Sequence, residues 1–280
     1  MKFVPKPVPE GINTTKVSHL REFIVLSFGL ILLLTITVIL LSLLTDQLVR
    51  YIPVKTEYKL FSFTHAIARP SQDPGSAQSR VEQYLSKLID RLQKGRQGDK
   101  QPFTVAVMDD PMPNAFALPG GHIVVTSSLF RHIQSENGLA MVLGHEMGHQ
   151  YARHPLRSMG RGVVVLLAIA VFTGTDGSEM IKSMVDSTVE LGLLKFDRDQ
   201  ERAADDTAVS LLQRVYGHAG GADEFFQSIQ KLEVKTGKNP LPGFMKTHPT
   251  TQERINHLQA IVDRTGKAKL VELPDFVKNY

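Results

Sequence analysis

The chain has 280 residues, and its 32 lysine and arginine side chains against 28 aspartate and glutamate side chains give a net charge of +4. This excess is small and dispersed, which excludes the basic footprint of a nucleic-acid-binding protein. There is no cysteine, so disulfide bonds and thiolate metal ligands are excluded, and a metal site would have to use histidine, aspartate and glutamate. A hydrophobic content of 42% is enough for a sizeable core.

The first element along the chain is an uncharged run of 22 residues, 23–44. At ~1.5 Å per residue, a helix of this length crosses a hydrocarbon core of ~30 Å. A cleaved secretory signal is the alternative, but its apolar core is normally only ~7–15 residues long, with a small-residue cleavage site close behind. The nearest pattern of that kind, Ala66-Ile67-Ala68, lies far downstream. We therefore expect a retained transmembrane anchor.

The basic residues on either side of this run bear on its orientation. Four precede it and three follow within an equal stretch: Lys2, Lys6, Lys16 and Arg21, then Arg50, Lys55 and Lys59. Under the positive-inside rule, this slight difference favours a cytoplasmic N-terminus. We expect the rest of the chain to lie outside the cytoplasm.

Turn-forming residues at 69–76 predict a linker that ends before a helix. From Val81 to Leu92, apolar residues recur at helical spacing, and this helix should end near Gly95 with one face in the core. Residues 103–108 then read as a strand.

A hairpin is predicted next, over 114–126, closed around Pro119-Gly120-Gly121. Everything after Ser135 looks helical. The expected helices are 137–153, 180–194, 199–215, 223–235 and 250–262, the last opening with a capping-box pattern just after His248. The fold class expected is α+β, mainly α.

The segment 145–149 reads His-Glu-Met-Gly-His within one of these helices. Positions four apart on a helix project the same way, so His145 and His149 can both reach one cation at ~2.0–2.1 Å. Glu146 lies 100° round from His145, which suits a general base acting on metal-bound water. A coincidental match, with the histidines on a polar face, has odds on the order of one in a hundred in a chain of this size.

Two glycines strengthen the motif. Gly144 and Gly148 each cost a helix ~1 kcal/mol relative to alanine, and together they form a narrow strip on its surface. Close approach by another backbone would explain them.

Two histidines do not complete a catalytic zinc site, which normally takes three protein ligands and leaves one position for water. Without cysteine, the third ligand must be histidine, aspartate or glutamate, and the best candidate is Glu201. Asp205 lies one helical turn further on, where it can accept a hydrogen bond from the far nitrogen of a ligand histidine. A solvated, charged helix face is the alternative reading of this segment.

A short apolar run, 163–172, is only about half as long as a membrane span. We expect a buried or interfacial helix there. A second membrane pass is the alternative, and it would place His149 and Glu201 on opposite sides of the bilayer.

The motifs stand in a specific order: His-Glu-Met-Gly-His at 145–149, Arg-x-x-Glu-x-x-Ala-Asp at 198–205, and Thr-His-Pro at 247–249 before a capped helix. In this combination the chain, over roughly residues 80–265, resembles the gluzincin metallopeptidases of the HtpX and CaaX-prenyl-protease type, metallopeptidase family forty-eight. The resemblance implies a zincin-like domain and hydrolysis of peptide bonds.

The same resemblance assigns roles to residues of this chain. It implies one zinc ion held by His145, His149 and Glu201, with Glu146 as the catalytic base. It further implies that His248 stabilises the oxyanion, that Arg198 and Asp205 support the ligand helix, and that the edge strand Asn114, Ala115 and Phe116 receives an extended substrate.

One departure concerns the third ligand segment. Many relatives read Glu-x-Glu-Ala-Asp, whereas this chain has Arg202 and Ala203 after Glu201. A second departure is the single clear membrane span, because HtpX-like members have more. The chain is therefore expected to be a singly anchored envelope enzyme, in a bacterial inner membrane with a periplasmic catalytic domain, acting in protein quality control.

The division of the chain expected from these features is an N-terminal tail, an anchor, a linker, a zinc metallopeptidase domain and a C-terminal tail: 1–22, 23–44, 45–80, 81–265 and 266–280. The expected partners are a protein or peptide substrate and the membrane. A binding module with a structural zinc site is the rival, but such a site normally has four ligands and no use for Glu146. The sequence does not indicate an oligomeric state.

Overall fold

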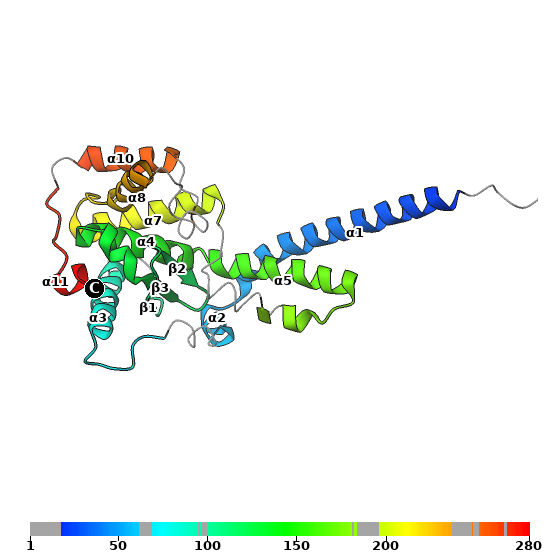
Figure 1. Ribbon diagram of the computed structural model, residues 1–280, viewed down its shortest axis with the longest axis horizontal. Helices are drawn as coiled ribbons and strands as arrows, with labels where there is room; N and C mark the ends of the chain where they lie inside the picture. Colours follow the sequence, from blue (N-terminus) through cyan, green and yellow to red (C-terminus); the bar gives the residue numbers. More distant parts are fainter. Residues whose placement is uncertain are drawn as a thin grey trace, which may run out of the picture.

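The computed structural model describes residues 18–61, 69–94, 96, 100–180, 182–183, 196–236, 248, 252–265 and 268–280 (Figure 1). These residues form a mainly helical domain around a small three-stranded sheet, with two long helices that leave one end of the domain side by side. The expected α+β, mainly α fold class is confirmed.

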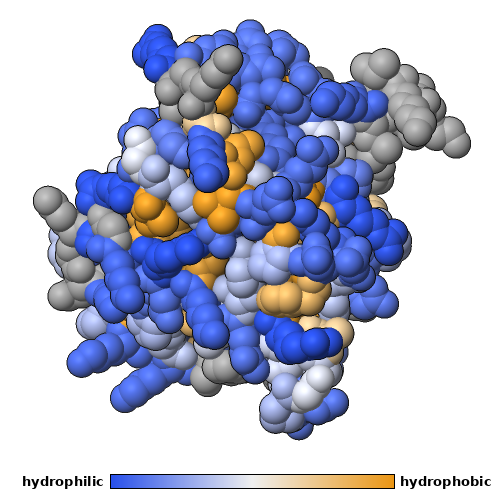
Figure 2. All heavy atoms as spheres, turned by 90° about the vertical axis from the view of Figure 1, so that its left-hand side faces the viewer, coloured by the Kyte–Doolittle hydropathy of each residue, from blue (hydrophilic) through white to orange (hydrophobic). Residues whose placement is uncertain are grey.

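The first long helix, α1 (His19–Leu48), contains the predicted anchor. Ser18 caps its N-terminus by accepting a hydrogen bond from the Arg21 N–H. None of its residues is buried, and large apolar side chains are exposed along its whole length. The face of the domain at the opposite end of the molecule is mostly hydrophilic (Figure 2). A helix this apolar and this exposed fits a membrane anchor.

The second long helix, α5 (His154–Thr173), contains the run 163–172, for which a buried or interfacial helix was expected, and it contradicts the buried alternative. The run is the outer half of a 20-residue helix, long and apolar enough to cross a membrane, rather than an isolated short segment. It is not a buried helix, because Val171 is 79% exposed and Phe172 is 64% exposed. The helix packs along α1, which the composition of the run could not reveal.

The segment between anchor and domain, 45–80, was expected to be a linker, but its first part is folded onto the domain. It forms η1 (Val49–Tyr51) and α2 (Val54–Leu60). Arg153 donates to the backbone carbonyls of Val49 and Ile52, which fixes the end of α1 against the start of α5.

Next, α3 (Ala77–Lys94) buries its predicted apolar stripe: Val81, Leu85, Leu88, Ile89 and Leu92. Because these positions recur every three or four residues, they share the helix face that packs on the sheet. This face belongs to the main hydrophobic core of the described residues.

The sheet consists of β1 (Thr104–Met108), β2 (Ala115–Leu118) and β3 (His122–Thr126), in the order β1-β3-β2. The predicted hairpin is present as the antiparallel pair β2 and β3. Gly120 and Gly121 close it with φ of +90° and +79°, which side chains rarely adopt. The parallel pairing of β1 with β3 was not foreseen.

The helices that carry the candidate site follow. A 3-10 turn, η3 (Ser127–His132), leads to α4 (Glu136–Tyr151), and α7 (Arg198–Tyr216) starts with a capping box between Asp197 and Gln200. The remaining helices are α8 (Glu224–Thr236), α10 (Gln252–Thr265) and α11 (Asp275–Lys278). The expected helix 180–194 and the expected capping box at 250–253 lie largely outside the described residues.

The C-terminal residues, expected to be a tail, pack on the domain. Glu272 forms a β-bridge with Ser135, the residue that caps α4. Val277 of α11 is completely buried. This segment therefore holds the N-terminal end of α4 in place.

The two site helices, α4 and α7, cross in close contact. A Cβ atom added at Gly148 would lie 2.9 Å from the Cα atom and 3.1 Å from the carbonyl oxygen of Ala204. At Gly144 it would lie 3.2 Å from the Cα atom of Ala208. The glycine strip therefore lets the α7 backbone approach α4, as its spacing suggested.

Gly148→Ala should destabilise the protein by about 1–3 kcal/mol, because the added methyl group meets backbone rather than a flexible side chain. Gly29→Ala is the matched control, since it is also within a helix but has nothing within 4 Å of the added atom. Thermal unfolding in detergent checks this. Equal stability of the two variants would contradict the packing argument.

Candidate metal centre

Four side chains from three parts of the chain converge beside the sheet. They are His145 and His149 of α4, Glu201 of α7, and His248. One ligand atom from each lies within 4.8 Å of the others. All four are buried, with His145 at 5% exposure and the others at 0%.

The predicted ligand triad is brought together by the structure. The Nε2 atoms of His145 and His149 are 3.0 Å apart, and each lies 3.4 Å from an oxygen of Glu201. The two histidines are one turn apart on α4, as the spacing required. Glu201 reaches them because α7 crosses α4 at the glycine strip.

The charges in this cluster follow from its burial. Burial alone would raise the pKa of Glu201, but the charge of His248 and hydrogen bonds to the α4 histidines hold it well below its usual range. Burial also keeps the pKa of His149 well below its usual value. Glu201 is therefore an anion and His149 a neutral imidazole, which are the forms that bind metal ions.

His145 has a different balance. Burial lowers its pKa, but hydrogen bonds and charge interactions with Asp205 and Glu201 outweigh it and raise the pKa to about 10. A cation entering the cluster would displace this proton, because a metal ligand histidine must offer a free lone pair.

A second layer of side chains orients the ligands. Asp205 places Oδ1 2.9 Å from the Nδ1 atom of His145, which turns the Nε2 atom toward the cluster. On His149, the Nδ1 atom lies 2.9 Å from the Nδ1 atom of His154. Phe196 stacks on the His149 ring with 3.9 Å between ring centroids.

Arg254 of α10 joins the two acidic residues of α7. Its Nε and Nη2 atoms donate to both oxygens of Asp205 at 2.8 and 2.9 Å, and its Nη1 atom lies 2.5 Å from Oε2 of Glu201. A two-pronged contact of this kind fixes a carboxylate in both position and angle. The guanidinium group therefore locks the third ligand and its neighbour together.

Arg254 and His154 were not identified from the sequence, and Arg198 was expected in a supporting role. Arg198 is exposed in the first turn of α7 and, within the described residues, makes no ion pair with the cluster. Both Arg254 and His154 lie close in the sequence to a member of the cluster, and this is the sequence feature that could have indicated them. Arg254 follows His248 by six residues, and His154 follows His149 by five.

Glu146, the expected base, is completely buried beside the ligands. Its Oε1 atom lies 3.5 Å from the Nε2 atom of His248, and neither oxygen has a side-chain hydrogen-bond partner among the described residues. Burial raises its pKa, although the charges of His248 and His145 and the Ala117 backbone N–H act in the opposite direction. A carboxylate with free acceptor positions at this point is suited to accept a proton from water.

His248 lies closer to the ligands than its expected role required. Its Nδ1 atom is 3.0 Å from Oε1 of Glu201 and 3.2 Å from the Nε2 atom of His145. In this arrangement it occupies the place of a fourth ligand.

The expected edge strand Asn114, Ala115 and Phe116 coincides with the start of β2, which is the outer strand in the order of the described sheet. Its residues are buried, because Phe116 packs within a small apolar cluster and α4 lies against the strand. Gln150 of α4 donates to the Leu118 carbonyl. The strand thus lies beside the cluster at the edge of the described sheet, and its role in receiving a substrate stays a prediction.

The donor set fits a metal ion. Burying three imidazoles and a carboxylate together costs free energy, because these polar groups lose their hydrogen bonds to water. A shared cation would compensate for this loss. Nitrogen and oxygen donors without sulfur suit divalent ions such as zinc.

Comparison with known proteins gives the family. The model of Peptidase family M48 matches residues 76–262, which is more than half of the chain and includes every residue of the cluster. The resemblance to metallopeptidase family forty-eight is thereby confirmed. The closer placement beside HtpX and the CaaX-prenyl proteases stays a prediction.

Curated relatives carry protease names. The chain is 27% identical over 185 residues to the beta-barrel assembly-enhancing protease of Escherichia coli, covering 62% of this chain and 37% of that protein. A Vibrio cholerae protein provisionally given the same name is 30% identical over 185 residues, covering 62% of this chain and 38% of that one.

Similarity extends to mitochondrial proteins. The mitochondrial metalloendopeptidase OMA1 of Schizosaccharomyces pombe is 28% identical over 177 residues, covering 63% of this chain and 51% of that protein. The chain thus spans about half or less of the length of these relatives. With the family model matched across the histidine and glutamate cluster, this chain belongs to peptidase family M48, and the prediction of a metallopeptidase is confirmed.

Proposed function

We propose that the chain is a membrane-anchored zinc endopeptidase that cleaves unfolded or extended protein segments. The observation that carries the proposal is the meeting of His145, His149 and Glu201 within reach of one ion, with Glu146 beside them. A zinc ion held there would lower the pKa of a bound water toward ~7 and polarise the scissile carbonyl.

Proton transfer and the positioning of the ligands would be carried out by side chains of this chain. Glu146 takes the proton of the attacking water and returns it to the leaving amine, which needs no covalent intermediate. Asp205 and Arg254 do not touch substrate. They hold the ligands in the geometry that leaves one coordination position for water.

His248 is proposed to donate to the oxyanion of the tetrahedral intermediate. Its Nδ1 atom now lies 3.0 Å from Glu201 among the ligand atoms, and four protein ligands would leave no position for water. The side chain must therefore move off the ligands before it can act on substrate. This movement would make the arrangement described here a resting form of the enzyme.

The membrane position of the enzyme follows from α1, and we propose that the outer half of α5 lies in the bilayer beside it. Apolar side chains exposed on both helices favour lipid over water. Between His149 and Glu201 the chain would then enter the membrane and return on the same side, so the two residues would stay together. An extracytoplasmic peptidase domain, from about residue 81 to 265, in a bacterial envelope quality-control role agrees with the bacterial relatives' names.

A structural metal site in a binding module is the rival proposal, and the position of His248 as a fourth ligand favours it. Cleavage of casein by the full chain, lost on adding a chelator and restored by zinc, would support the peptidase. Stoichiometric zinc without any cleavage, under conditions that expose the site, would support the rival.

Glu146→Gln should retain one zinc ion per chain and lose nearly all casein cleavage, because the amide cannot accept the proton of water. Metal content by mass spectrometry and cleavage rates check this on the same preparation. Glu253→Gln makes the same chemical change at an exposed position and serves as the control. Full activity of Glu146→Gln with zinc bound would exclude the mechanism.

Arg254→Gln should leave Asp205 and Glu201 buried without their cation, at a cost of about 3–5 kcal/mol, and should weaken zinc binding. Arg254→Lys should restore the charge but only part of the zinc affinity, because it lacks the planar fork. The control is Arg202→Gln, whose ion pair with Glu253 is exposed and is worth about 0–1 kcal/mol. Unfolding temperatures and zinc titrations measure both effects. Indistinguishable Arg254→Gln and Arg202→Gln variants would refute the positioning role.

A further inference from the structure

A pocket separate from the metal centre lies at the membrane end of the domain, and we propose that it binds the headgroup of an anionic phospholipid. It has a volume of about 680 Å³. Its lining comes from α2 and from described residues between α3 and β1: Val54, Lys55, Tyr58 and Lys59, then Arg96, Lys100, Gln101 and Pro102.

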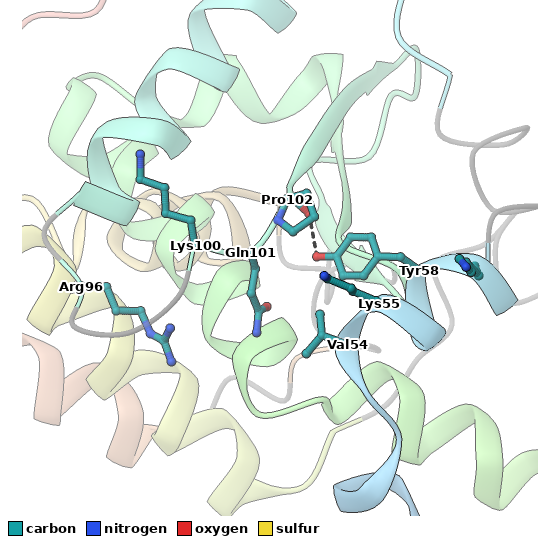
Figure 3. Close-up of a pocket in the computed structure, with 8 residues that line it drawn as sticks. Val54, Lys55, Tyr58, Arg96, Lys100, Gln101 and Pro102 are labelled. Carbon is teal, nitrogen blue, oxygen red and sulfur yellow. Dashed lines mark hydrogen bonds between the residues drawn. The ribbon is translucent and has the colours of Figure 1, made fainter.

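The charge of the pocket is the first argument. Four of the lining residues are cationic, and no carboxylate lines it among the described residues. None of the four forms an ion pair within the part of the chain that the structure describes. Figure 3 shows Arg96 and Gln101 on one side of the space, with Val54 and Lys55 on the other. An anion between them would meet positive charge from both sides.

The pocket is held in shape by its surroundings, unlike a row of free surface lysines. The Tyr58 hydroxyl donates to the Pro102 carbonyl at 2.6 Å, which joins α2 to the opposite wall. The Arg96 guanidinium lies 3.9 Å from the ring centroid of Tyr151, at the end of α4. Glu57, on the inner face of α2, accepts from the Gly120 N–H and pairs with Arg153.

The distance to the membrane is the second argument. The apolar helix α1 ends at Leu48, and α2 starts only six residues later, at Val54. Between them Tyr51 is 82% exposed, which is typical of an aromatic side chain at a membrane surface. With α1 as the membrane anchor proposed above, the pocket would lie at the height of lipid headgroups.

The lining favours a lipid over a small anion. Val54, Pro102 and the ring of Tyr58 add an apolar wall beside the cations. A phospholipid offers both a phosphate and an apolar glycerol ester region to such a site, whereas inorganic phosphate uses only the charges. Basic side chains close to a membrane attract anionic lipids by the same electrostatic force.

The test uses the full chain in a neutral detergent, titrated by calorimetry with dihexanoyl phosphatidylglycerol. Dihexanoyl phosphatidylcholine, inorganic phosphate and a glutamate-rich decapeptide are titrated in parallel. Saturable binding of phosphatidylglycerol, tighter than that of the other three, is expected. Equal binding of phosphatidylcholine, or phosphate or peptide binding at least as tightly as phosphatidylglycerol, would overturn the proposal.

A double variant, Lys55→Gln with Lys59→Gln, should weaken phosphatidylglycerol binding on the order of tenfold or more. These side chains make no hydrogen bond or ion pair among the described residues, so the fold should be unaffected. Lys87→Gln with Lys231→Gln is the matched control, with the same charge change at exposed helix positions outside the pocket lining. An equal loss in both double variants would assign the binding to net charge and overturn the site.

Arg96→Gln provides a second, independent variant on the opposite wall. It should also weaken phosphatidylglycerol binding, and its unfolding temperature without lipid reports any loss of the contact with Tyr151. Unchanged lipid affinity in both Arg96→Gln and the lysine double variant would refute the pocket as the binding site.

Discussion

The close crossing of α4 and α7 is the constraint on which the site depends. His145 and His149 are placed by the helix repeat alone, but their third partner comes from a helix that starts about fifty residues later. Glycine at 144 and 148 lets the two backbones approach closely, because a Cβ atom added at either position would lie 3.2 Å or less from a Cα atom of α7. The metal centre therefore depends on the absence of side chains at these two positions as well as on the ligands of α4.

Around this crossing, buried charges balance one another in layers. The negative charges of Glu201 and Asp205 are neutralised on one side by Arg254 and on the other by the protonated imidazole of His145. Removing one member leaves its partner buried without compensation, which costs more than the pair contributes by itself. This explains why residues that never touch a substrate can be as important to the site as the ligands.

The sequence predicted those parts of the molecule that depend on local periodicity. The HExxH motif and the stripe on α3 follow the repeat of the helix they form, and the uncharged run in α1 is recognised by its length. The contacts of Arg254 and His154 and the docking of α2 depend on how distant segments meet, and no spacing in the sequence encodes them. The buried alternative for the run 163–172 of α5 was wrong for the same reason, because how much of a helix the rest of the chain covers is decided by distant segments.

Full enclosure of Glu146, His149 and Glu201, each at 0% exposure, has a kinetic consequence. A polypeptide cannot reach these side chains in this conformation, so under the proposed peptidase function turnover would scale with the fraction of molecules in which the site is open. A shift of that equilibrium by 1.4 kcal/mol would then change the rate of proteolysis about tenfold, without altering a single catalytic group.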